Sequence, residues 1–238
     1  MCNRGYIVYG GSFNPLHIGH MRLAIECLAM MGELVAHLEF LPSAAPPHKQ
    51  GEPMLPFAMR TQMIDATIAG QPAMLCNPIE ASRPGPSFTY ETLSQLKKER
   101  PDAPVYFLIG SQDFLLLPTW HKGLQLTDFC NLVIVPRGNF DQEEFRAHAL
   151  RFWPGSDDIS MFGTKACLGG SGYCIRLKNG ASLYWLPIHY IDISSSRIRK
   201  LWLCGKSITY LVPGQVEEIL AMNRQAVKGY WQEKTCSM

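Results

Sequence analysis

The sequence predicts an α/β protein built on a doubly wound, mainly parallel sheet. Strand-like and helix-like segments alternate along much of the chain, and two strand-like segments, 105–109 and 132–135, are continuous apolar runs. Strands that are buried on both faces of a parallel sheet have this composition. The 238 residues, 47% of them apolar, could form one large domain or two small ones with a substantial core, and we expect a single domain over 1–238.

The elements are expected in a regular order. A strand over 6–9 leads through a Gly-rich turn to a helix, in which apolar residues recur at helical spacing from Leu23 to Met31. After a second strand over 34–41 and a Pro-rich loop, a helix is expected to begin near Pro56, because proline suits a first turn. The elements expected next are a helix that continues to about 69, a strand over 73–76, a helix over 88–100, the two apolar strands, a strand over 183–188, and helices over 195–204 and 213–223.

Residues 139–182 interrupt this alternation. Gly169-Gly170-Ser171-Gly172 reads as a flexible turn, and Asn179-Gly180 between the apolar segments 175–177 and 183–185 predicts a β-hairpin. We therefore expect an insertion at about 139–182 and a helical C-terminal part at about 194–230. A structural embellishment is favoured for the insertion over a separate binding site.

Composition excludes several classes of function. The net charge of +2, with 18% charged residues and no basic stripe, argues against binding of long nucleic acid. No apolar run is long enough to span a bilayer, and residues 1–5 do not resemble a signal peptide, so a cytoplasmic protein is expected. Eight scattered cysteines without a C-x-x-C pair, Cys27 and Cys76 among them, favour buried free thiols. The alternative is a zinc site that uses Cys167 and Cys174.

One loop near the start carries the strongest chemical signal, Gly10-Gly11-Ser12-Phe13-Asn14-Pro15-Leu16-His17-Ile18-Gly19-His20. Its glycines let backbone N–H groups approach a polyanion, and the start of the following helix carries about half a positive charge. His17 and His20 are three residues apart, so they share one face and can donate to phosphate oxygens. The loop matches neither the P-loop pattern nor G-x-G-x-x-G, which indicates a different kind of phosphate-binding loop.

Three further polar segments follow predicted strands. Ligands of a doubly wound sheet bind beyond the carboxyl ends of its strands, so we expect these segments to share one rim with the first loop. The segments are Pro46-Pro47-His48-Lys49, Gly110-Ser111-Gln112-Asp113 and Ile193-Ser194-Ser195-Ser196-Arg197-Ile198-Arg199. A shared rim would bring the two imidazoles and a guanidinium around one polyanion.

The cluster of serines at 194–196 lies at the start of a predicted helix. Hydroxyl and N–H groups at a helix start can cap the helix or bind phosphate. Capping explains one of the three serines at 194–196, and three serines with two arginines favour a phosphate site. Arg197 and Arg199 are two apart on a helix, so one can face phosphate while the other faces solvent.

These segments, in this order, resemble the motifs of bacterial-type nicotinate mononucleotide adenylyltransferases, in the nucleotidyltransferase superfamily. The likeness covers about 5–137 and 183–222 and includes Ser87-Phe88-Thr89-Tyr90-Glu91-Thr92-Leu93 and Leu117-Pro118-Thr119-Trp120. It implies a Rossmann-like nucleotidyltransferase fold and adenylyl transfer from ATP to nicotinate mononucleotide, which gives deamido-NAD and pyrophosphate in NAD biosynthesis. Asn14 departs from the usual Asp, and because Asn-Pro also occurs in eukaryotic enzymes that use nicotinamide mononucleotide, it bears on substrate preference. Ser196 replaces the usual Thr and keeps the hydroxyl.

The resemblance also implies roles for individual residues. It assigns His17 to the α-phosphate and bridging oxygen of ATP, His20 to the triphosphate nearer the leaving group, and Arg199 to the β- and γ-phosphates. The other ATP contacts that it implies are Gly10, Gly11, Ser12, Phe13, Gly110, Asp113, Ser195 and Ser196. For the mononucleotide they are His48 and Lys49 at the phosphate, and Thr89 and Trp120 at the pyridine ring. Mg²⁺ is expected to enter on the ATP phosphates with few protein ligands, so no residue is assigned to a metal.

Several residues have a plain structural alternative. Trp120 could belong to the core, Lys49 could be an ordinary solvated lysine, and Asp113 could cap a helix. The histidines at 121, 148 and 189 belong to no motif and are interpreted as structural or surface residues.

Other functions are considered beside this one. Adenylyl transfer to nicotinamide mononucleotide is the nearest alternative, and phosphopantetheine as acceptor is disfavoured by the segment 87–93 and by Trp120. A non-catalytic nucleotide sensor is disfavoured by the presence of His17, His20 and Arg199. A fragment of a class I aminoacyl-tRNA synthetase would also carry H-I-G-H, but the chain has no K-M-S-K-S-like loop. The partners expected are small molecules, ATP and nicotinate mononucleotide, without nucleic acid or membrane, and the oligomeric state is left open.

Overall fold

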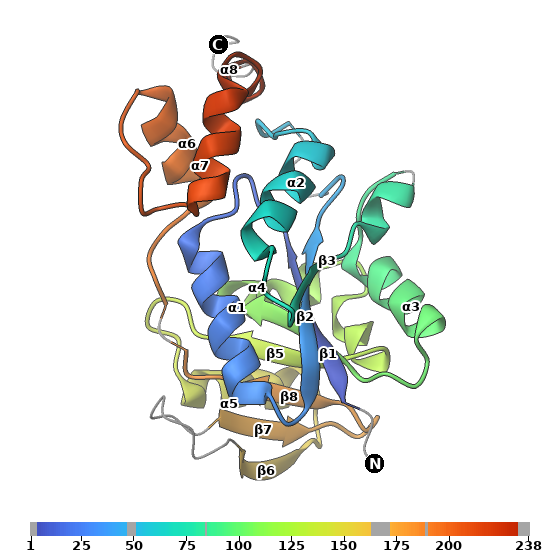
Figure 1. The fold of residues 1–238 in the computed structure, drawn as a ribbon. Helices are drawn as coiled ribbons and strands as arrows, with labels where there is room; N and C mark the ends of the chain where they lie inside the picture. Colours follow the sequence, from blue (N-terminus) through green and yellow to red (C-terminus); the bar gives the residue numbers. More distant parts are fainter. Residues whose placement is uncertain (1–3, 47–50, 84, 163–171, 189, 233–238) are drawn as a thin grey trace. The chain divides into compact units, whose positions relative to one another are not determined.

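The computed structural model of the chain describes residues 4–46, 51–83, 85–162, 172–188 and 190–232. It shows an α/β fold with an eight-stranded sheet in the order β3-β2-β1-β4-β5-β8-β7-β6 (Figure 1). The strands are β1 (Gly5–Gly11), β2 (Val35–Pro42), β3 (Met74–Cys76), β4 (Val105–Gly110), β5 (Asn131–Val135), β6 (Asp157–Phe162), β7 (Gly172–Arg176) and β8 (Ser182–Trp185). The helices are α1 (Ile18–Met31), α2 (Phe57–Ile68), α3 (Thr89–Glu99), α4 (Ser111–Leu116), α5 (Gln142–Phe152), α6 (Ser195–Leu203), α7 (Gly214–Met222) and α8 (Arg224–Gln232), with 3-10 turns η2 (Ile79–Ser82), η3 (Leu117–Thr119) and η4 (Gly123–Asp128).

The sheet confirms the predicted α/β class with mainly parallel strands. β1 pairs with β4, β4 with β5, and β5 with β8, all in parallel. From β1 the chain first enters β2 on one side and later β4 on the other, so the order of the strands reverses between β1 and β4. Tyr9 pairs with Leu108 there, and Gly10 and Gly110 follow near the carboxyl ends of the two strands. That position is where doubly wound sheets bind ligands.

Two compact units make up the chain, and each is described by itself. The first comprises Met1–Gly10, Leu23–Glu39 and Phe88–Tyr190. The second comprises Gly11–Arg22, Phe40–Ser87 and Ile191–Met238. We call them unit 1 and unit 2.

The core of unit 1 contains the two apolar strands. Residues 105–109 of β4 and 132–135 of β5 are all buried, as continuous apolar runs predict. The aromatic side chains of Phe145 and Trp185 stack with ring centroids 5.5 Å apart, joining α5 to β8. Phe114 of α4 packs against the Phe145 ring at 5.6 Å.

The segment over 139–182 extends the sheet of unit 1. It contributes α5 and the antiparallel pair β6 and β7, and β7 pairs antiparallel with β8 (Figure 1). The predicted hairpin is confirmed: Ile175 pairs with Leu183, and Gly180 has a φ of +88°, which suits glycine in a tight turn. Asn179 Oδ1 accepts the Ala181 N–H at 3.1 Å and braces the turn. Of the turn predicted at 169–172, residues 169–171 lie outside the described residues, and Gly172 is the first residue of β7.

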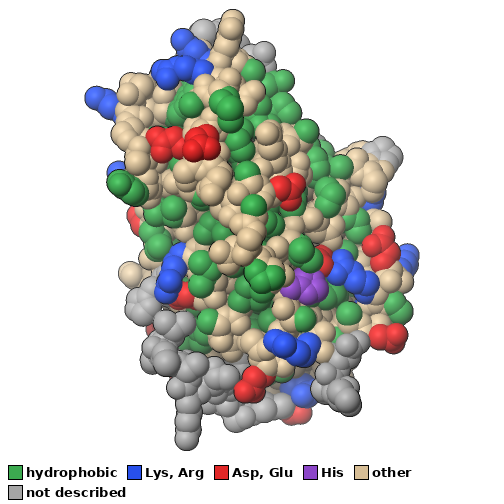
Figure 2. All heavy atoms as spheres, viewed as in Figure 1, with side chains coloured by type: hydrophobic (Ala, Val, Ile, Leu, Met, Phe, Trp, Pro, Cys, Tyr) green, Lys and Arg blue, Asp and Glu red, His purple; other side chains and the backbone are tan. Residues whose placement is uncertain are grey.

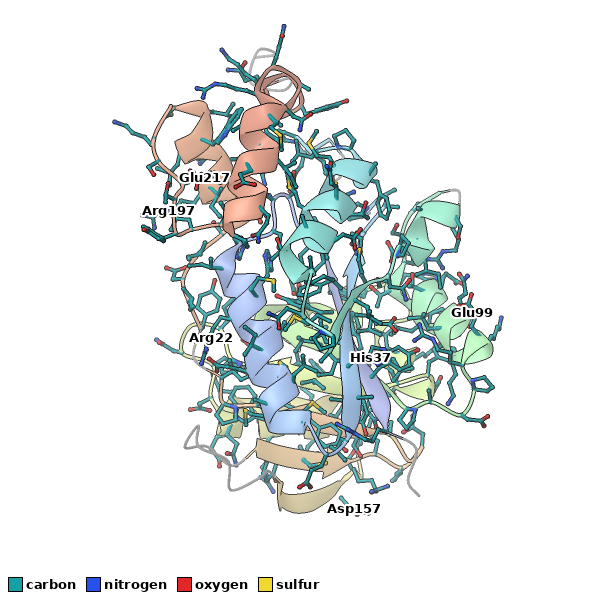
Figure 3. All side chains as sticks on the ribbon, viewed as in Figure 1. Arg22, His37, Glu99, Asp157, Arg197 and Glu217 are labelled. Carbon is teal, nitrogen blue, oxygen red and sulfur yellow. The ribbon has the colours of Figure 1, made fainter. Side chains whose placement is uncertain are left out.

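An ion pair between the partly exposed Arg100 and the buried Glu39 braces β2 in unit 1. The Arg100 guanidinium contacts both carboxylate oxygens of Glu39, at 2.5 and 3.0 Å, and lies over the Tyr6 ring with Cζ 4.1 Å from its centroid. His37, labelled in Figure 3, stacks on the same ring and contacts Glu39 at 2.9 Å. The Tyr6 hydroxyl is buried without a hydrogen-bond partner among the described residues.

Unit 2 holds the loop that begins at Gly11, together with α2 and the C-terminal helices. The predicted helix near Pro56 is confirmed as α2, with Pro56 in the N-cap position. Helices α6, α7 and α8 lie together (Figure 1). The two predicted C-terminal helices correspond to α6 and α7, and α8 occupies the rest of the part expected to be helical.

The surface in Figure 2 is of mixed charge, and the described cysteines are free as predicted but not all buried, since Cys204 is exposed. On the face drawn in Figure 2, Lys and Arg side chains are scattered among Asp and Glu rather than gathered into a stripe. Within the described ranges, no helix combines the length and apolarity needed to cross a membrane. The described cysteines are free, with Cys27 and Cys130 buried and Cys76 half-buried. The alternative zinc site depends on Cys167, which lies outside the described residues.

Candidate active site

Side-chain donors hold the backbone of the loop 12–15 in unit 2 through three carbonyl groups. Arg60 Nη1 donates to the Ser12 carbonyl at 2.8 Å, and Arg199 Nη1 donates to the Asn14 carbonyl at 2.9 Å. Ser195 Oγ donates to the Pro15 carbonyl at 2.9 Å. The start of α6 is thereby attached to the loop that leads into α1.

His17 and His20 form a reciprocal pair at the start of α1. The backbone N–H of His17 donates to His20 Nδ1 at 3.2 Å, and that of His20 donates to His17 Nδ1 at 3.4 Å. The rings stack with centroids 3.5 Å apart. An Nδ1 that accepts carries no proton, so each neutral ring has its proton on Nε2. Both imidazoles are therefore arranged to donate from Nε2.

Local geometry explains three residues of the segment from the end of β1 to His20. A Cβ on Gly19 would lie 3.1 Å from His17 Nδ1, so a side chain there would press on the ring. Phe13 adopts a φ of +44°, is buried, and contacts the His20 ring edge to face at 5.1 Å. A Cβ on Gly11 would lie 3.0 Å from the Phe13 ring, which accounts for glycine at that position. Gly11, Ser12 and Phe13 thus form a tightly packed approach to the histidines.

Helix α6 presents its serines and arginines in distinct ways. Ser194 caps the helix by accepting the Arg197 N–H at 3.3 Å, as capping predicts for one of the serines. Ser196 Oγ accepts from Arg199 Nη2 at 3.2 Å. Arg199 is half-buried, whereas Arg197 is exposed and projects outward in Figure 3. The expected division between one inward and one outward arginine is what α6 shows.

The guanidinium groups of Arg60 and Arg199 stay charged at neutral pH. Burial lowers the pKa of Arg199, and the Glu52 carboxylate raises it. Burial lowers the pKa of Arg60 to about 10, against a rise caused by Glu80. Arg60 therefore keeps its positive charge at pH 7, and a guanidinium such as that of Arg199 is not deprotonated in proteins.

Asn14 is almost completely buried, and its side chain bonds to three described residues of unit 2. Its Nδ2 donates to the Pro53 carbonyl at 2.8 Å. Its Oδ1 accepts from the Leu55 N–H at 3.1 Å and from Trp231 Nε1 at 3.3 Å. With 3% of its surface exposed, the residue is part of the framework under the loop.

Three predicted ATP contacts lie in unit 1. Gly10 and Gly110 lie near the carboxyl ends of β1 and β4, where a Cβ on Gly10 would meet the Phe107 ring at 3.2 Å. Asp113 is exposed in the first turn of α4, and Gly110, not Asp113, stands at the N-cap. Asp113 therefore lies in the first turn of α4 and does not occupy the N-cap position.

The structure brings together the two segments that carry Thr89 and Trp120, within unit 1. Phe88 and His121, their immediate neighbours, have ring centroids 4.6 Å apart, and Lys122 Nζ lies 4.2 Å above the Tyr90 ring. Thr89 is half-buried as the first residue of α3. Trp120 is half-buried at the end of η3, so it is not a core residue. His121 is exposed, as expected of a surface histidine.

The remaining mononucleotide candidates, His48 and Lys49, lie outside the described residues, as does His189. A pocket of about 500 Å³ in unit 2 is lined by residues on both sides of that segment in the sequence. The lining residues are Ala44, Ala45, Pro46, Glu52, Met54, Gly85 and Pro86.

The donor groups around the loop suit an anion better than a metal ion. They are imidazole, guanidinium and hydroxyl groups, whereas Mg²⁺ prefers carboxylate, phosphate and water oxygens. Over the described ranges, no three His, Cys, Asp or Glu side chains gather in a way that could hold a metal. The residues at this loop therefore fit a polyanion and do not by themselves form a Mg²⁺ cage.

Sequence reasoning missed two residues that support the loop. Arg60 was one position among several polar ones in a predicted helix, and Trp231 lay beyond the last matched motif. A buried arginine and a buried tryptophan N–H show their partners only after the chain folds, so neither had a local signal.

Comparisons with known proteins identify the family of the chain. The family model described as cytidylyltransferase-like matches residues 8–201. Curated relatives include proteins named probable nicotinate-nucleotide adenylyltransferase from Pelobacter propionicus, 35% identical over 222 residues, and from Geobacter metallireducens, 33% identical over 218 residues. The first alignment covers 90% of this chain and 94% of the relative, and the second covers 91% and 95%.

Solved structures give the same fold. Nicotinic acid mononucleotide adenylyltransferase of Plasmodium falciparum, complexed with APC, matches with a TM-score of 0.68 at 18% identity, over 93% of this chain and 96% of that chain. The same enzyme complexed with NaAD also gives 0.68, at 19% identity, over 93% and 97%. At these identities the structural likeness establishes the fold alone.

The family indicated by the sequence motifs is thus confirmed by independent comparisons. The family match spans most of the chain, and relatives above 30% identity cover about nine tenths of it. The chain therefore belongs to the cytidylyltransferase-like family, with nicotinate-nucleotide adenylyltransferases among its relatives.

Proposed function

We propose that this protein transfers the adenylyl group of ATP to nicotinate mononucleotide, giving deamido-NAD and pyrophosphate in NAD biosynthesis. The names of the curated relatives support the reaction. The observation that carries the proposal is that one compact unit holds the stacked pair His17 and His20 together with Arg199, which is bonded to the same loop. These groups offer several hydrogen-bond donors and a fixed positive charge to one polyanion.

The reaction needs no nucleophile from the protein. A 5′-phosphate oxygen of the mononucleotide attacks the α-phosphorus of ATP, and the bond from that phosphorus to the oxygen bridging to the β-phosphate breaks. Pyrophosphate leaves with the electron pair of that bond. Catalysis of such transfers consists mainly of positioning and of stabilising charge on the leaving group.

The imidazoles and Arg199 would supply that stabilisation. Nε2–H of His17 would donate to the α-phosphate and bridging oxygen, and Nε2–H of His20 would donate nearer the leaving group. Arg199 would hold the β- and γ-phosphates, because a planar guanidinium keeps its charge and can donate twice. Ser195 and Ser196 would add donors at the start of α6, and Gly10, Gly11, Ser12, Phe13, Gly110 and Asp113 would line the ATP side.

The segments around Thr89 and Trp120 would bind the pyridine ring. Trp120 is half-buried, so one part of its indole is held while another can stack on a ligand. Thr89 would contribute its hydroxyl or N–H at the start of α3. His48 and Lys49 would bind the mononucleotide phosphate.

Mg²⁺ would enter with ATP. When bound to the phosphates it neutralises charge on the triphosphate and leaving pyrophosphate. We assign it no protein ligand, because the groups around the loop are cationic or neutral donors.

Asn14 does not favour the nicotinamide alternative. Its side-chain amide is engaged by Pro53, Leu55 and Trp231. These bonds use the amide to hold the framework under the loop. The presence of Asn14 therefore does not support nicotinamide mononucleotide as the substrate.

Pyrophosphate release tests the function directly. The purified chain is incubated with Mg²⁺–ATP and nicotinate mononucleotide, nicotinamide mononucleotide or phosphopantetheine in turn. We expect the highest kcat/KM with nicotinate mononucleotide, and a much lower kcat/KM for ATP in Arg199→Gln. A higher kcat/KM with nicotinamide mononucleotide would identify that compound as the substrate. ATP binding without pyrophosphate release for any acceptor would identify a nucleotide sensor.

A further inference from the structure

Helix α8 reaches the candidate active-site loop through one buried side chain. Trp231 is 2% exposed, and its Nε1–H donates to Asn14 Oδ1 at 3.3 Å across 217 residues of sequence. The family match ends at residue 201, so α8 lies outside the part of the chain that defines the family.

The same tryptophan packs on the helix that carries Arg199. The Trp231 and Trp202 rings meet edge to face, with centroids 5.1 Å apart and planes at 88°. Trp202 belongs to α6, three residues after Arg199, and Arg224 of α8 lies over the Trp202 ring at 5.6 Å. Trp231 therefore contacts both the loop and the helix that the proposed mechanism brings to the triphosphate.

These contacts connect Trp231, Asn14 and helix α6 to one another. Trp231 bonds to the side chain of Asn14, Arg199 bonds to the backbone carbonyl of Asn14, and Trp231 packs on Trp202 of α6. The loop is held at Asn14 by one donor to its side-chain oxygen and another to its backbone carbonyl. The Trp231 indole also packs against helix α6. A displacement of the indole N–H would free one side of Asn14 and so change where its carbonyl meets Arg199.

We propose that Trp231 is a positioning residue, which holds Asn14 and α6 in the relation that directs Arg199 to the triphosphate. The inference rests on the proposed function for the identity of the anion, but its geometry requires only that the chain bind ATP. Trp231 touches no substrate in this account. It acts through Asn14 and Arg199.

The rest of α8 provides a matched control. Val227, one turn earlier, is the other buried residue of the helix. Val227→Ala removes packing from α8 without touching the Asn14 bond. Trp231→Phe keeps an aromatic ring against Trp202 and removes the N–H donor. A third variant with benzothienylalanine at 231 keeps the shape of indole and replaces N–H by sulfur, which separates loss of the bond from loss of volume.

The test measures the affinity of the full chain for a non-hydrolysable ATP analogue, beside kcat for pyrophosphate release and unfolding in urea. We expect both Trp231 variants to weaken analogue binding about tenfold, and Val227→Ala to change it less than twofold at an equal or larger loss of stability. In an Arg199→Gln background, the Trp231 variants should weaken analogue binding less than twofold. The guanidinium that Trp231 positions is absent there, so its misplacement has no further effect on affinity.

Three results would overturn the proposal. They are unchanged analogue affinity in the benzothienylalanine variant, an equal loss in Val227→Ala, and a full tenfold loss that persists in the Arg199→Gln background. Failure of the proposed function would look different. The wild-type chain would then release no pyrophosphate with nicotinate mononucleotide, while the dependence of analogue binding on Trp231 would still be measured.

Discussion

Arg199 and Asn14 are 185 residues apart in the sequence, yet Arg199 Nη1 donates to the Asn14 backbone carbonyl at 2.9 Å. Asn14 lies three residues before His17, so this bond attaches the guanidinium to the loop that carries the imidazoles. The attachment needs no ligand. A triphosphate that binds at this loop would therefore meet a largely prepared set of donors, which lowers the ordering cost of binding.

Replacing His17 by Ala should lower kcat at least a hundredfold while the fold survives. One lost donor to a transition-state charge commonly costs about 3 kcal/mol, and His17 is placed to donate from Nε2. Steady-state pyrophosphate release gives kcat, and circular dichroism reports the fold. His37→Gln is the matched control, because His37 is a half-buried imidazole of unit 1 whose contact with Glu39 a glutamine can keep. Near-normal turnover of His17→Ala would remove this residue from the chemistry.

Arg199→Gln and Arg197→Gln should behave differently although they lie on one helix. We expect Arg199→Gln to reduce kcat/KM for ATP about thirtyfold or more, because a hydrogen bond to a charged group contributes about 2 kcal/mol. Arg197 is exposed, so its variant should stay within about twofold of wild type. Both are compared by varying ATP at saturating mononucleotide. Equal losses in the two variants would point to general electrostatic attraction in place of a specific contact.

Trp120→Ala should raise KM for the mononucleotide more than KM for ATP. Stacking of an aromatic side chain on a ring contributes about 1 kcal/mol, so we expect roughly a fivefold difference between the two effects. The measurement varies each substrate against a saturating concentration of the other. Similar increases in both KM values would contradict a role for Trp120 in binding the pyridine ring.

Tyr6→Phe should be neutral or stabilising at pH 7, because it removes a buried hydroxyl without a hydrogen-bond partner among the described residues. The ring stays in place for Arg100 and His37. Burial raises the pKa of Tyr6 from 10.0 to about 12, although Arg100 lowers it. The folded protein therefore keeps a proton that the unfolded chain loses between pH 10 and about 12, so stability falls as pH rises through that range.

The variant should lose less stability than wild type on going from pH 9 to pH 11, by about 1 kcal/mol. Urea unfolding at pH 7, 9 and 11 measures both effects. Tyr9 and Tyr184, whose pKa values burial also raises, remain in both proteins and cancel in the comparison. An equal loss in wild type and variant would show that Tyr6 does not retain its proton in the folded state.

Local patterns were sufficient for the parallel part of the fold. Continuous apolar runs identified β4 and β5, and Asn179-Gly180 identified the hairpin between β7 and β8. These signals are local because a strand buried on both faces must be apolar throughout, and a two-residue turn needs positive φ. The single-domain organisation expected over 1–238 stays a prediction.

Elements without such signals were not predicted. Helix α5 begins with a capping box of Asp141 and Glu144. It lies in the segment interpreted as an insertion, where strand-like and helix-like segments no longer alternate, so it was not predicted. β6 pairs only with β7 and lies at the sheet edge, so its sequence is weakly constrained.

For the candidate site, the motifs named the residues but not their supports. The pattern H-x-G-H indicated His17, Gly19 and His20, and the structure adds the reason for Gly19, whose side chain would press on the His17 ring. The supports that the motifs missed are Arg60 and Trp231, which bond to the Ser12 carbonyl and to the Asn14 side chain. Such contacts depend on tertiary structure, and a single sequence contains no periodicity or spacing that predicts them.

A crystal structure of the full chain with a non-hydrolysable ATP analogue is the most direct test of whether both ends of the sequence serve one triphosphate. We predict that Nε2 of His17, Nε2 of His20 and the guanidinium of Arg199 all lie within about 3.2 Å of its phosphate oxygens. A triphosphate bound away from this loop, or one held by the histidines while Arg199 contacts only protein, would contradict the account.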